Sequence, residues 1–293
     1  MKITLKNREK SFRQYSVCIL LILFVSCYKK VPIPSYIHID KFNFSVSDPI
    51  TQGSASNKIV DAWIEVDDQS VGAFELPCTI PVIYSGEHKI TVRPGIKDNG
   101  SATLRVVYQF YTAYVQTVTL TPKQITTISP SVTYASYAHF AWLENFDGNP
   151  NITSIVSSNS DTVMKTIVPP LAFEGAGSGA VYLAGSKTYY YGASLNKYVL
   201  PKFNAPVYLE MDFNCNSIFS VGIIGYDANN IISLQQELLK PYPTSGWNKV
   251  YINLTSAISG SANSEKFAIY FSMQKDITQT TSYFYIDNIK IVN

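Results

Sequence analysis

The sequence has few of the side chains that most catalytic and metal sites require. It contains three histidines and four cysteines in 293 residues, and only 15% of its residues are charged. His38, His88 and His139 lie far apart and form no HxH or HExxH pattern, and GxSxG, P-loop and CxxC motifs are missing. A glycosidase would need two acids that converge across a cleft, which no sequence pattern excludes. These absences favour a protein that is not an enzyme.

Charge is also scarce once the N-terminus is set aside. Residues 1–26 hold five of the 23 Lys and Arg side chains and one of the 21 Asp and Glu side chains. The rest of the chain therefore has 18 basic and 20 acidic side chains, and no cluster of Lys and Arg. A nearly neutral body argues against nucleic acid as a partner and against a basic patch for anionic membranes.

The N-terminus has the order of a secretory signal. A basic stretch is followed by an apolar run over residues 17–25 and then by Ser26 and Cys27. The basic side chains are Lys2, Lys6, Arg8, Lys10 and Arg13. Because a membrane-spanning helix needs roughly 20 apolar residues, this run is too short to cross a bilayer. Residues 1–26 are therefore predicted to be a signal peptide.

The segment Phe24-Val25-Ser26-Cys27 resembles the lipobox of bacterial lipoproteins. The resemblance implies that the Cys27 thiol carries a lipid that holds the mature protein on a membrane. It predicts an outer membrane lipoprotein on the periplasmic or the cell-surface face, and residues 27–35, with two prolines, are expected to be an extended tether. The alternative is an ordinary signal peptide, or a buried membrane segment, with a chance cysteine.

The rest of the chain is rich in residues that build β-sheets. Hydrophobic residues make up 46% of the sequence, which includes 21 tyrosines and 15 phenylalanines. Its length suits one or two domains with a sizeable core. The two remaining cysteines, Cys78 and Cys215, fall in different predicted domains, so buried thiols are favoured over a disulfide.

Residues 36–135 show the alternation of apolar and polar side chains that is typical of half-buried strands. Asp67-Asp68 and Asn99-Gly100 are turn signals between such runs. The alternation continues over residues 104–120, and a last strand is expected over residues 125–134. About seven short strands without an amphipathic helix predict an immunoglobulin-like β-sandwich.

Two segments of this domain, residues 64–72 and 84–92, resemble the pattern of PEGA-type surface domains. In that pattern a strand, a turn and a glycine lead to a second strand of the form Gly-x-His-x-Ile-x-Val. The resemblance implies a structural spacer or adhesion module without chemistry.

Residues 139–293 resemble the jelly-roll domains of carbohydrate-binding modules. Residues 144–148 (ENFDG) look like the opening strand of that fold, residues 175–183 like its Gly/Ser loop and second strand, residues 246–254 like its Gly-Trp strand, and residues 283–291 like its closing strand. The resemblance implies a second β-sandwich that binds saccharides. The predicted fold class is therefore all-β: an immunoglobulin-like sandwich followed by a jelly roll.

A structural Ca²⁺ often joins the first strand, the Gly/Ser loop and the last strand in such jelly rolls. The resemblance implies that Glu144 and Asp287 would supply carboxylate ligands. Asp287 lies among Tyr285, Ile286 and Ile289, where an ionised carboxylate needs a partner. A turn cap or hydrogen bonds to backbone amides would satisfy Asp287 equally well.

Sugar binding needs aromatic faces, because the C–H-rich face of a pyranose packs on an aromatic ring. Tyr189, Tyr190 and Tyr191 are expected in a loop between Gly185 and Gly192, with at least one ring exposed. Further candidates for ligand contact flank another predicted loop: Tyr242 and Trp247. For Trp247, a core position in its strand is the favoured alternative.

Two hypotheses of different classes follow. The first is a lipid-anchored envelope protein that binds a polysaccharide through its C-terminal jelly roll and has no catalytic activity. The second is a structural or adhesion lipoprotein that contacts another envelope protein.

Overall fold

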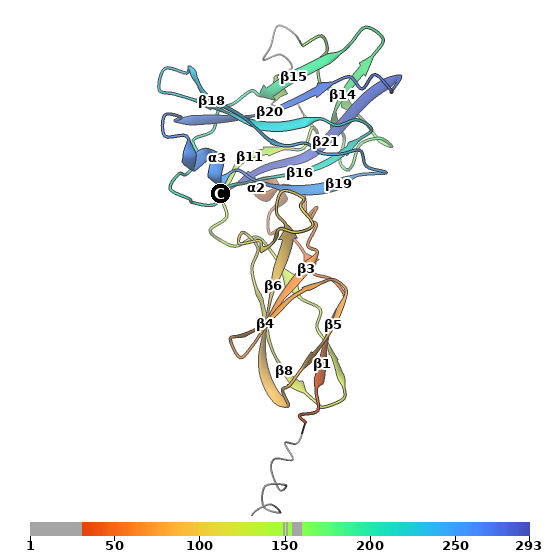
Figure 1. Ribbon diagram of the computed structural model, residues 1–293, viewed down its shortest axis with the longest axis vertical. Coiled ribbons are helices and arrows are strands. Elements are labelled where there is room, and N and C mark those ends of the chain that lie inside the picture. Colours follow the sequence, from red (N-terminus) through yellow and green to blue (C-terminus); the bar gives the residue numbers. More distant parts are fainter. Residues whose placement is uncertain (1–30, 149, 151, 154–159) are drawn as a thin grey trace, which may run out of the picture.

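The computed structural model describes residues 31–293, apart from residues 149, 151 and 154–159. Two β-sandwiches follow one another along the chain and stack end to end (Figure 1). The predicted signal peptide and Cys27 lie outside the described residues. Within the described part of the chain, no helix has the length and apolar character that a membrane crossing needs.

The N-terminal domain contains a three-stranded sheet of order β5-β1-β9 and a larger sheet of order β4-β3-β6-β7, in which β8 also pairs with β6. Its strands are β1 (Ser35–Ile39), β2 (Asn43–Phe44), β3 (Asp61–Val66), β4 (Gln69–Glu75), β5 (Cys78–Val82), β6 (Gly86–Lys97), β7 (Arg105–Val107), β8 (Tyr114–Leu120), β9 (Ile125–Thr127) and β10 (Ser131–Val132). A short helix, α2 (Pro49–Gln52), lies between β2 and β3. Inward-facing residues such as Ile37, Ile64 and Val92 pack into one core between the sheets.

Both turns expected in this domain are present. Asp67 and Asp68 join β3 to β4, and Asn99 and Gly100 join β6 to β7, all with positive φ. Two consecutive residues with positive φ give the turn whose twist matches that of a β-hairpin, and Asp, Asn and Gly adopt this conformation at low cost.

The C-terminal domain packs two sheets face to face. One has the order β13-β14-β21-β16-β19, with β11 also paired to β21, and is called the junction sheet; the other has the order β12-β15-β20-β17-β18 and is called the distal sheet. The elements are β11 (Phe140–Glu144), β12 (Ile152–Thr153), β13 (Lys165–Ile167), β14 (Ser178–Ala184), β15 (Tyr189–Ser194), β16 (Tyr208–Cys215), β17 (Ser220–Tyr226), β18 (Ile232–Leu239), β19 (Asn248–Asn253), α3 (Thr255–Gly260), β20 (Lys266–Gln274) and β21 (Thr281–Val292). The predicted all-β fold, with two successive sandwiches, is confirmed.

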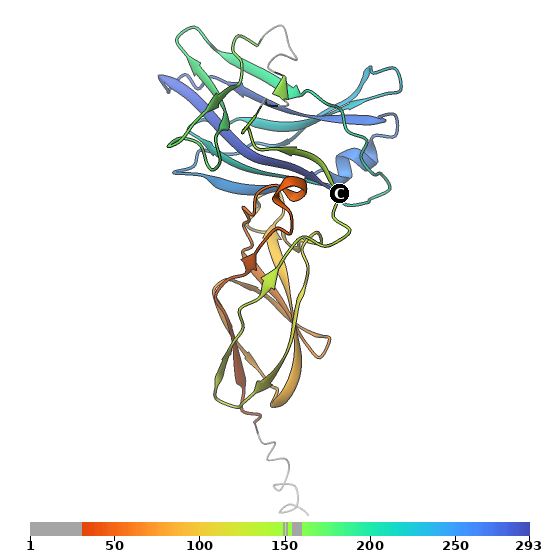
Figure 2. The same cartoon turned by 180° about the vertical axis from the view of Figure 1, so that it is seen from behind.

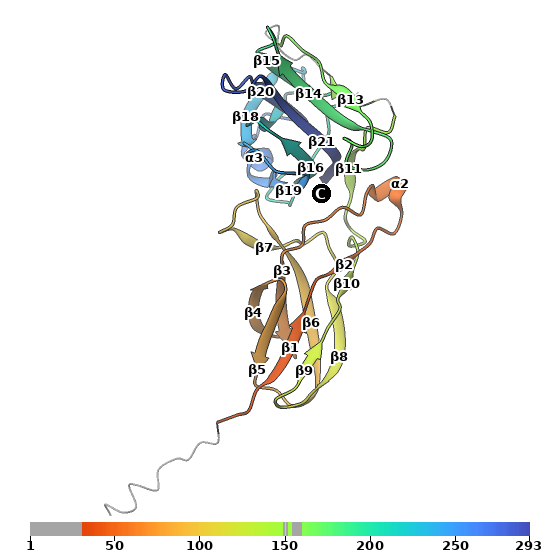
Figure 3. The ribbon, with the colours of Figure 1, turned by 90° about the vertical axis from the view of Figure 1, so that its right-hand side faces the viewer.

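The junction sheet faces the N-terminal domain (Figures 1 and 3). The two domains share one aromatic cluster. Tyr108, Tyr111 and Tyr134 come from the N-terminal domain, and Tyr208 and Tyr251 come from the junction sheet. The alternation over residues 104–120 predicted a strand, but β7 ends at Val107 and β8 begins at Tyr114. The tyrosines between them pack against the C-terminal domain instead. Similarly, the single strand expected over residues 125–134 is divided into β9 and β10.

A carboxylate at the centre of this junction is completely buried. Glu210 of β16 accepts hydrogen bonds from the hydroxyls of Tyr108, at 2.7 Å, and Tyr134, at 2.9 Å. The Lys249 ammonium lies 3.3 Å from the same carboxylate, and the Lys290 ammonium donates to the Tyr134 hydroxyl at 3.1 Å. Burial and the nearby Glu210 charge raise the pKa of Tyr108, so its hydroxyl stays protonated and donates.

Turn 98–100 of the N-terminal domain also covers the edge of the junction sheet. The Asn99 amide donates to the Tyr251 carbonyl at 2.9 Å, and the Asn253 amide donates to Asn99 Oδ1 at 2.8 Å. The hairpin thereby occupies the free side of β19, which would otherwise be open to pairing with another chain. On the other side, α2 packs against β11 (Figure 2).

Candidate functional site

The distal sheet has one face in the core and an outer face that points away from the N-terminal domain (Figures 1 and 3). Side chains alternate between these faces, as in β17, where Val221 and Ile223 belong to the core cluster. Gly222 and Ile224, which alternate with these two residues, lie on the outer face, and Ile224 joins an outer cluster with Tyr191 and Tyr270. The outer face therefore carries aromatic rings although it lies outside the main core.

The tyrosine triplet begins a strand, so the prediction that it lies in a loop is wrong. β15 starts at Tyr189, and its alternation sends Tyr190 into the core, where the side chain is completely buried. Tyr189 and Tyr191 face outward, and their ring centroids are 6.4 Å apart. Only these two members of the triplet belong to the outer face.

Asp161 fixes the beginning of this strand. One oxygen of its carboxylate accepts the Thr188 amide at 2.7 Å and the Thr188 hydroxyl at 3.0 Å, and the other accepts the Tyr189 amide at 3.4 Å. These bonds satisfy backbone groups at the strand end and hold the Tyr189 backbone in place.

The rings of Tyr191 and Tyr270 stack, with centroids 5.0 Å apart and planes 17° from parallel. The far end of the Tyr270 ring lies over Gly222, where a Cβ atom would meet ring carbons at 2.3 Å. The Gln235 side-chain amide reaches across from β18 and donates to the Tyr191 hydroxyl at 2.9 Å. Glycine at position 222 therefore makes room for a ring that crosses the sheet.

Beside this stack is an open cleft of about 510 Å³, which is within the range of small-molecule sites. Tyr189 forms an aromatic wall, and the strands supply Ser220, Ser272 and Gln274. The remaining lining residues are Ser217, Ile218, Lys240, Met273 and Asp276. The cleft thus combines one large ring with hydroxyl, amide, ammonium and carboxylate groups.

Asp276, which lines the cleft, and Glu237, which contacts the lining residues Ser220 and Lys240, are both held in their ionised forms. The Ser220 hydroxyl donates to Glu237 at 2.6 Å and lowers the pKa of that carboxyl, and Lys240 lies 3.1 Å from it. The Thr278 side chain and amide donate to Asp276 at 2.7 and 2.9 Å and lower its pKa. Both acids are therefore hydrogen-bond acceptors at neutral pH.

The other predicted aromatic contacts lie elsewhere. Tyr242 is 71% exposed in the loop between β18 and β19, and it is not among the residues that line the cleft. Trp247 is half-buried and contacts Phe173 and Tyr285 beside the junction sheet, with ring centroids 5.3 and 6.2 Å away. Trp247 and the Tyr189 cleft therefore belong to different sheets and form no common site.

The carboxylates proposed as Ca²⁺ ligands face opposite sides of the junction sheet. Glu144 pairs with the core residue Ile289, and its carboxylate accepts the Phe146 amide at 2.8 Å. Asp287 accepts the Ser178 hydroxyl at 2.6 Å on the other face. Among the residues that the structure describes, no group of three or more His, Cys, Asp or Glu side chains could hold a metal ion. The pair does not fit one ion site, and a structural Ca²⁺ stays a prediction.

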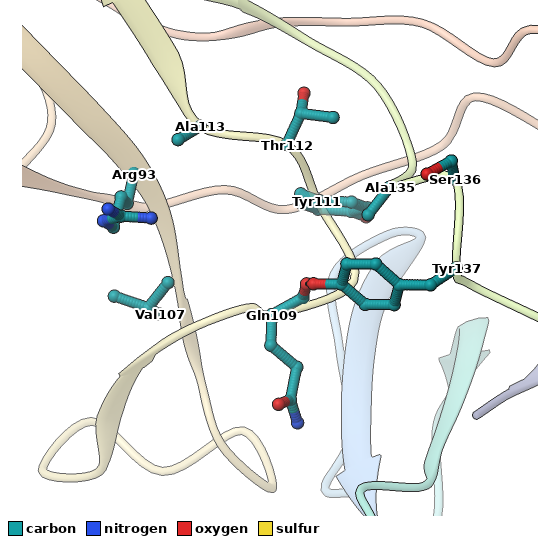
Figure 4. A pocket seen from close by; sticks show the side chains of 9 residues that line it. All are labelled: Arg93, Val107, Gln109, Tyr111, Thr112, Ala113, Ala135, Ser136 and Tyr137. Carbon is teal, nitrogen blue, oxygen red and sulfur yellow. The ribbon is translucent and has the colours of Figure 1, made fainter.

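A second hollow, of about 410 Å³, lies in the N-terminal domain near the junction (Figure 4). Its lining includes Arg93, Gln109, Tyr111, Thr112 and Tyr137. The Gln109 and Thr112 side chains point in opposite directions in Figure 4, and the Arg93 guanidinium is paired with a glutamate. Because its polar groups do not converge, this hollow is a weaker candidate than the cleft at Tyr189.

Sequence patterns missed several residues of the distal face. Tyr270 lies between the core residues Ile269 and Phe271, so its strand reads as one continuous apolar run. β18 was not predicted, because two glutamines and a glutamate interrupt its apolar pattern. Leucines at positions 234 and 238, which pack against the core, are the signal that could have revealed it.

No protein-family model and no curated protein sequence matches the chain. Among solved structures, a carbohydrate-binding module of the β-sandwich superfamily matches with 12% identity and a TM-score of 0.40, over 80% of this chain and 86% of that one. The family 11 carbohydrate-binding module of a Clostridium thermocellum cellulosomal cellulase has 16% identity and a TM-score of 0.38, over 53% and 95%. The enzymatically active domain of a bacteriophage CBA120 tailspike protein has 9% identity and a TM-score of 0.38, and this chain spans only 20% of its length.

Proposed function

We propose that the C-terminal domain binds a glycan at the cleft beside Tyr189. The observation that carries this proposal is the pairing of an aromatic wall with Ser220, Ser272 and Gln274 in a cleft of small-molecule size. A pyranose can pack its C–H face on the tyrosine ring while its hydroxyls exchange hydrogen bonds with these side chains. The Tyr189 ring lies beside the Tyr191 ring, which in turn stacks on the Tyr270 ring.

The proposed role is binding without cleavage. A glycosidase needs one carboxyl that is protonated near neutral pH and donates its proton to the leaving oxygen. The carboxyls near the cleft, Glu237 and Asp276, have lowered pKa values because hydroxyl groups donate to them. Neither is suited to carry that proton.

We further propose that a lipid on Cys27 anchors the chain to the outer membrane. The described chain begins at the end of the N-terminal domain that is far from the C-terminal domain, while the distal face points the opposite way (Figure 1). An anchor at the N-terminus would therefore leave the cleft directed away from the membrane. Growth with an alkyne-bearing fatty acid should label the wild-type chain, and Cys27→Ala should abolish the label. An unlabelled wild-type chain would contradict the anchor and leave the glycan proposal standing.

Glycan binding is tested with the detergent-solubilised full chain on a glycan array and in affinity electrophoresis through soluble polysaccharides. Tyr189→Ala should weaken binding at least about tenfold, because the stacking ring is lost. Tyr242→Ala is the matched control, since it removes an exposed tyrosine outside the cleft. The proposal would be refuted if the chain bound none of the plant, host and bacterial glycans tested, or if wild type and Tyr189→Ala bound equally well.

A second candidate function, contact with another envelope protein, is favoured by one observation. A patch of aromatic rings lies on strands β14 and β21 of the junction sheet and in the loops next to them: Phe173, Tyr182, Trp247, Tyr283 and Tyr285. Within the described residues, the ring contacts of this patch come from the C-terminal domain alone. Tyrosine and tryptophan are enriched where proteins bind one another. Cross-linking in intact cells that repeatedly captures one protein, and loses it in Trp247→Ala, would support this function.

A further inference from the structure

Side chains of the distal sheet form a bar across its outer face. Tyr191 belongs to β15 and Gln235 to β18, and two strands, β20 and β17, lie between them. Strands are spaced about 4.8 Å apart, so the two backbones are separated by about 14 Å. Their side chains nevertheless meet, with 2.9 Å between the Gln235 amide nitrogen and the Tyr191 hydroxyl. The contact therefore spans the face from one strand to the other.

The Tyr270 ring is the third member of this bar and packs against Tyr191. It stacks on Tyr191 and extends over Gly222, so it also crosses from its own strand to the next. Both tyrosines are buried, with 7% and 5% of their surface exposed. The bar is thus closely packed and not a pair of loose side chains.

The cleft lies on one side of the bar. Ser272 and Gln274 follow Tyr270 along β20 and line the cleft, and Ser220 precedes Gly222 on β17. On the other side of the bar are Ile224 and Tyr226, and the Lys197 ammonium is 3.6 Å from the centre of the Tyr226 ring. The bar therefore separates the cleft from the rest of the outer face.

We infer that the cleft takes a short oligosaccharide that lies across the strands, and not a long chain that lies along them. The inference rests on the glycan function proposed above. A glycan chain that follows the strands from the cleft meets the bar at Tyr191 and Tyr270. A chain that crosses them stays on the cleft side of the bar, which runs obliquely from Tyr191 to Gln235, and leaves the sheet after the three strand spacings from β15 to β18. Contact is therefore limited to a few sugar residues in either direction.

The experiment measures affinity against chain length by titration calorimetry of the detergent-solubilised full chain. The probes are gluco-, xylo-, manno- and galacto-oligosaccharides, each from di- to hexasaccharide. For a series that binds, affinity should change by less than about threefold from tetra- to hexasaccharide. A larger rise would overturn the inference while leaving glycan binding intact. No binding by any series would remove the proposed function and this inference together.

Two variants test whether the bar sets this limit. Tyr191→Ala/Tyr270→Ala removes both rings and should let affinity continue to rise, by more than about threefold, from tetra- to hexasaccharide. Gln235→Ala is the matched control, because it removes the hydrogen bond but leaves the stacked rings, so it should keep the wild-type limit. Circular dichroism and thermal unfolding confirm that each variant is folded. A folded double variant with the wild-type limit would overturn the inference.

Discussion

The buried carboxylate at the domain junction gives the most quantitative test of the structure. Glu210→Ala would leave the Lys249 ammonium, which is 2% exposed, with Asp212 at 3.9 Å as its nearest carboxylate. It would also remove the acceptor of the Tyr108 and Tyr134 hydroxyls. Breaking a buried ion pair costs about 3–5 kcal/mol, and each stranded hydroxyl adds about 1 kcal/mol. We expect the free energy of unfolding to fall by at least about 5 kcal/mol, the lower end of this sum.

The assay combines urea unfolding, followed by tryptophan fluorescence, with scanning calorimetry. Trp63 reports on the N-terminal domain, and Trp142 and Trp247 report on the C-terminal domain. At about 2–4 °C per kcal/mol, the loss corresponds to a fall of roughly 10–20 °C in melting temperature. Because the junction joins the two cores, the wild type should unfold in one transition and the variant in two.

A double variant separates the stranded charge from the loss of packing. Glu210→Ala/Lys249→Met removes both members of the pair, and apolar replacement of a buried pair is often close to neutral. It should therefore recover most of the stability that Glu210→Ala loses. A Glu210→Ala chain within about 1 kcal/mol of wild type would refute the reasoning, because it would mean that water reaches Lys249. A double variant no more stable than the single one would refute it too.

Three further predictions concern the C-terminal domain. Tyr190→Ala should lower the free energy of unfolding by about 3–5 kcal/mol in urea titrations, because the ring is completely buried, whereas Tyr189→Ala should leave it nearly unchanged. Gly222→Ala should cost about 1–3 kcal/mol in the same assay and weaken glycan binding, since the new methyl group would collide with the Tyr270 ring and the Gln236 backbone carbonyl. Burial raises the pKa of Asp287 to about 7, above its unfolded value near 3.8, so the folded state binds this proton more tightly than the unfolded state does. The protonated carboxyl therefore stabilises the fold fully below pH 4. This stability should be lost as the pH rises through 7, by at most about 4 kcal/mol. Urea titrations at several pH values should show this decline in the wild type and a flatter profile in Asp287→Asn, because the variant lacks the titrating carboxyl. The neighbouring Lys290 does not contribute between pH 4 and 7, since its pKa is lowered only to about 8.

Local sequence patterns predicted the strands and turns that depend on residues close together in the chain. The alternating strands of the N-terminal sandwich and the Asp67-Asp68 and Asn99-Gly100 turns follow from neighbouring residues, whereas the closing strand β21 was indicated by the resemblance to jelly-roll domains. Residues 108–113 kept an alternating pattern without forming a strand, because their rings are buried against the other domain. The same alternating pattern therefore occurs both in a strand and in a loop between domains, and contacts with residues distant in the sequence decide which of the two forms.

The candidate site was predictable only in part. Three adjacent tyrosines indicated that some of these rings must leave the core, since neighbours on a strand point to opposite faces. The sequence did not show that Tyr190 is the buried one, nor that Ser220, Ser272 and Gln274 join Tyr189 from two other strands. Residues so far apart in the chain become neighbours only through the order of strands in the distal sheet.

The amino-acid sequence by itself determined a nearly neutral chain with one strand-built sandwich over residues 36–135, because alternation and turn residues act over a few positions, and the second sandwich was implied by the resemblance of residues 139–293 to jelly-roll domains. The tertiary structure decided which face of each sheet is covered. It placed the N-terminal domain over the junction sheet through Glu210 and its tyrosine partners, and it left the cleft on the distal sheet. The physical reason is that strand order and domain packing depend on contacts between residues about 100 positions apart, which no local pattern encodes.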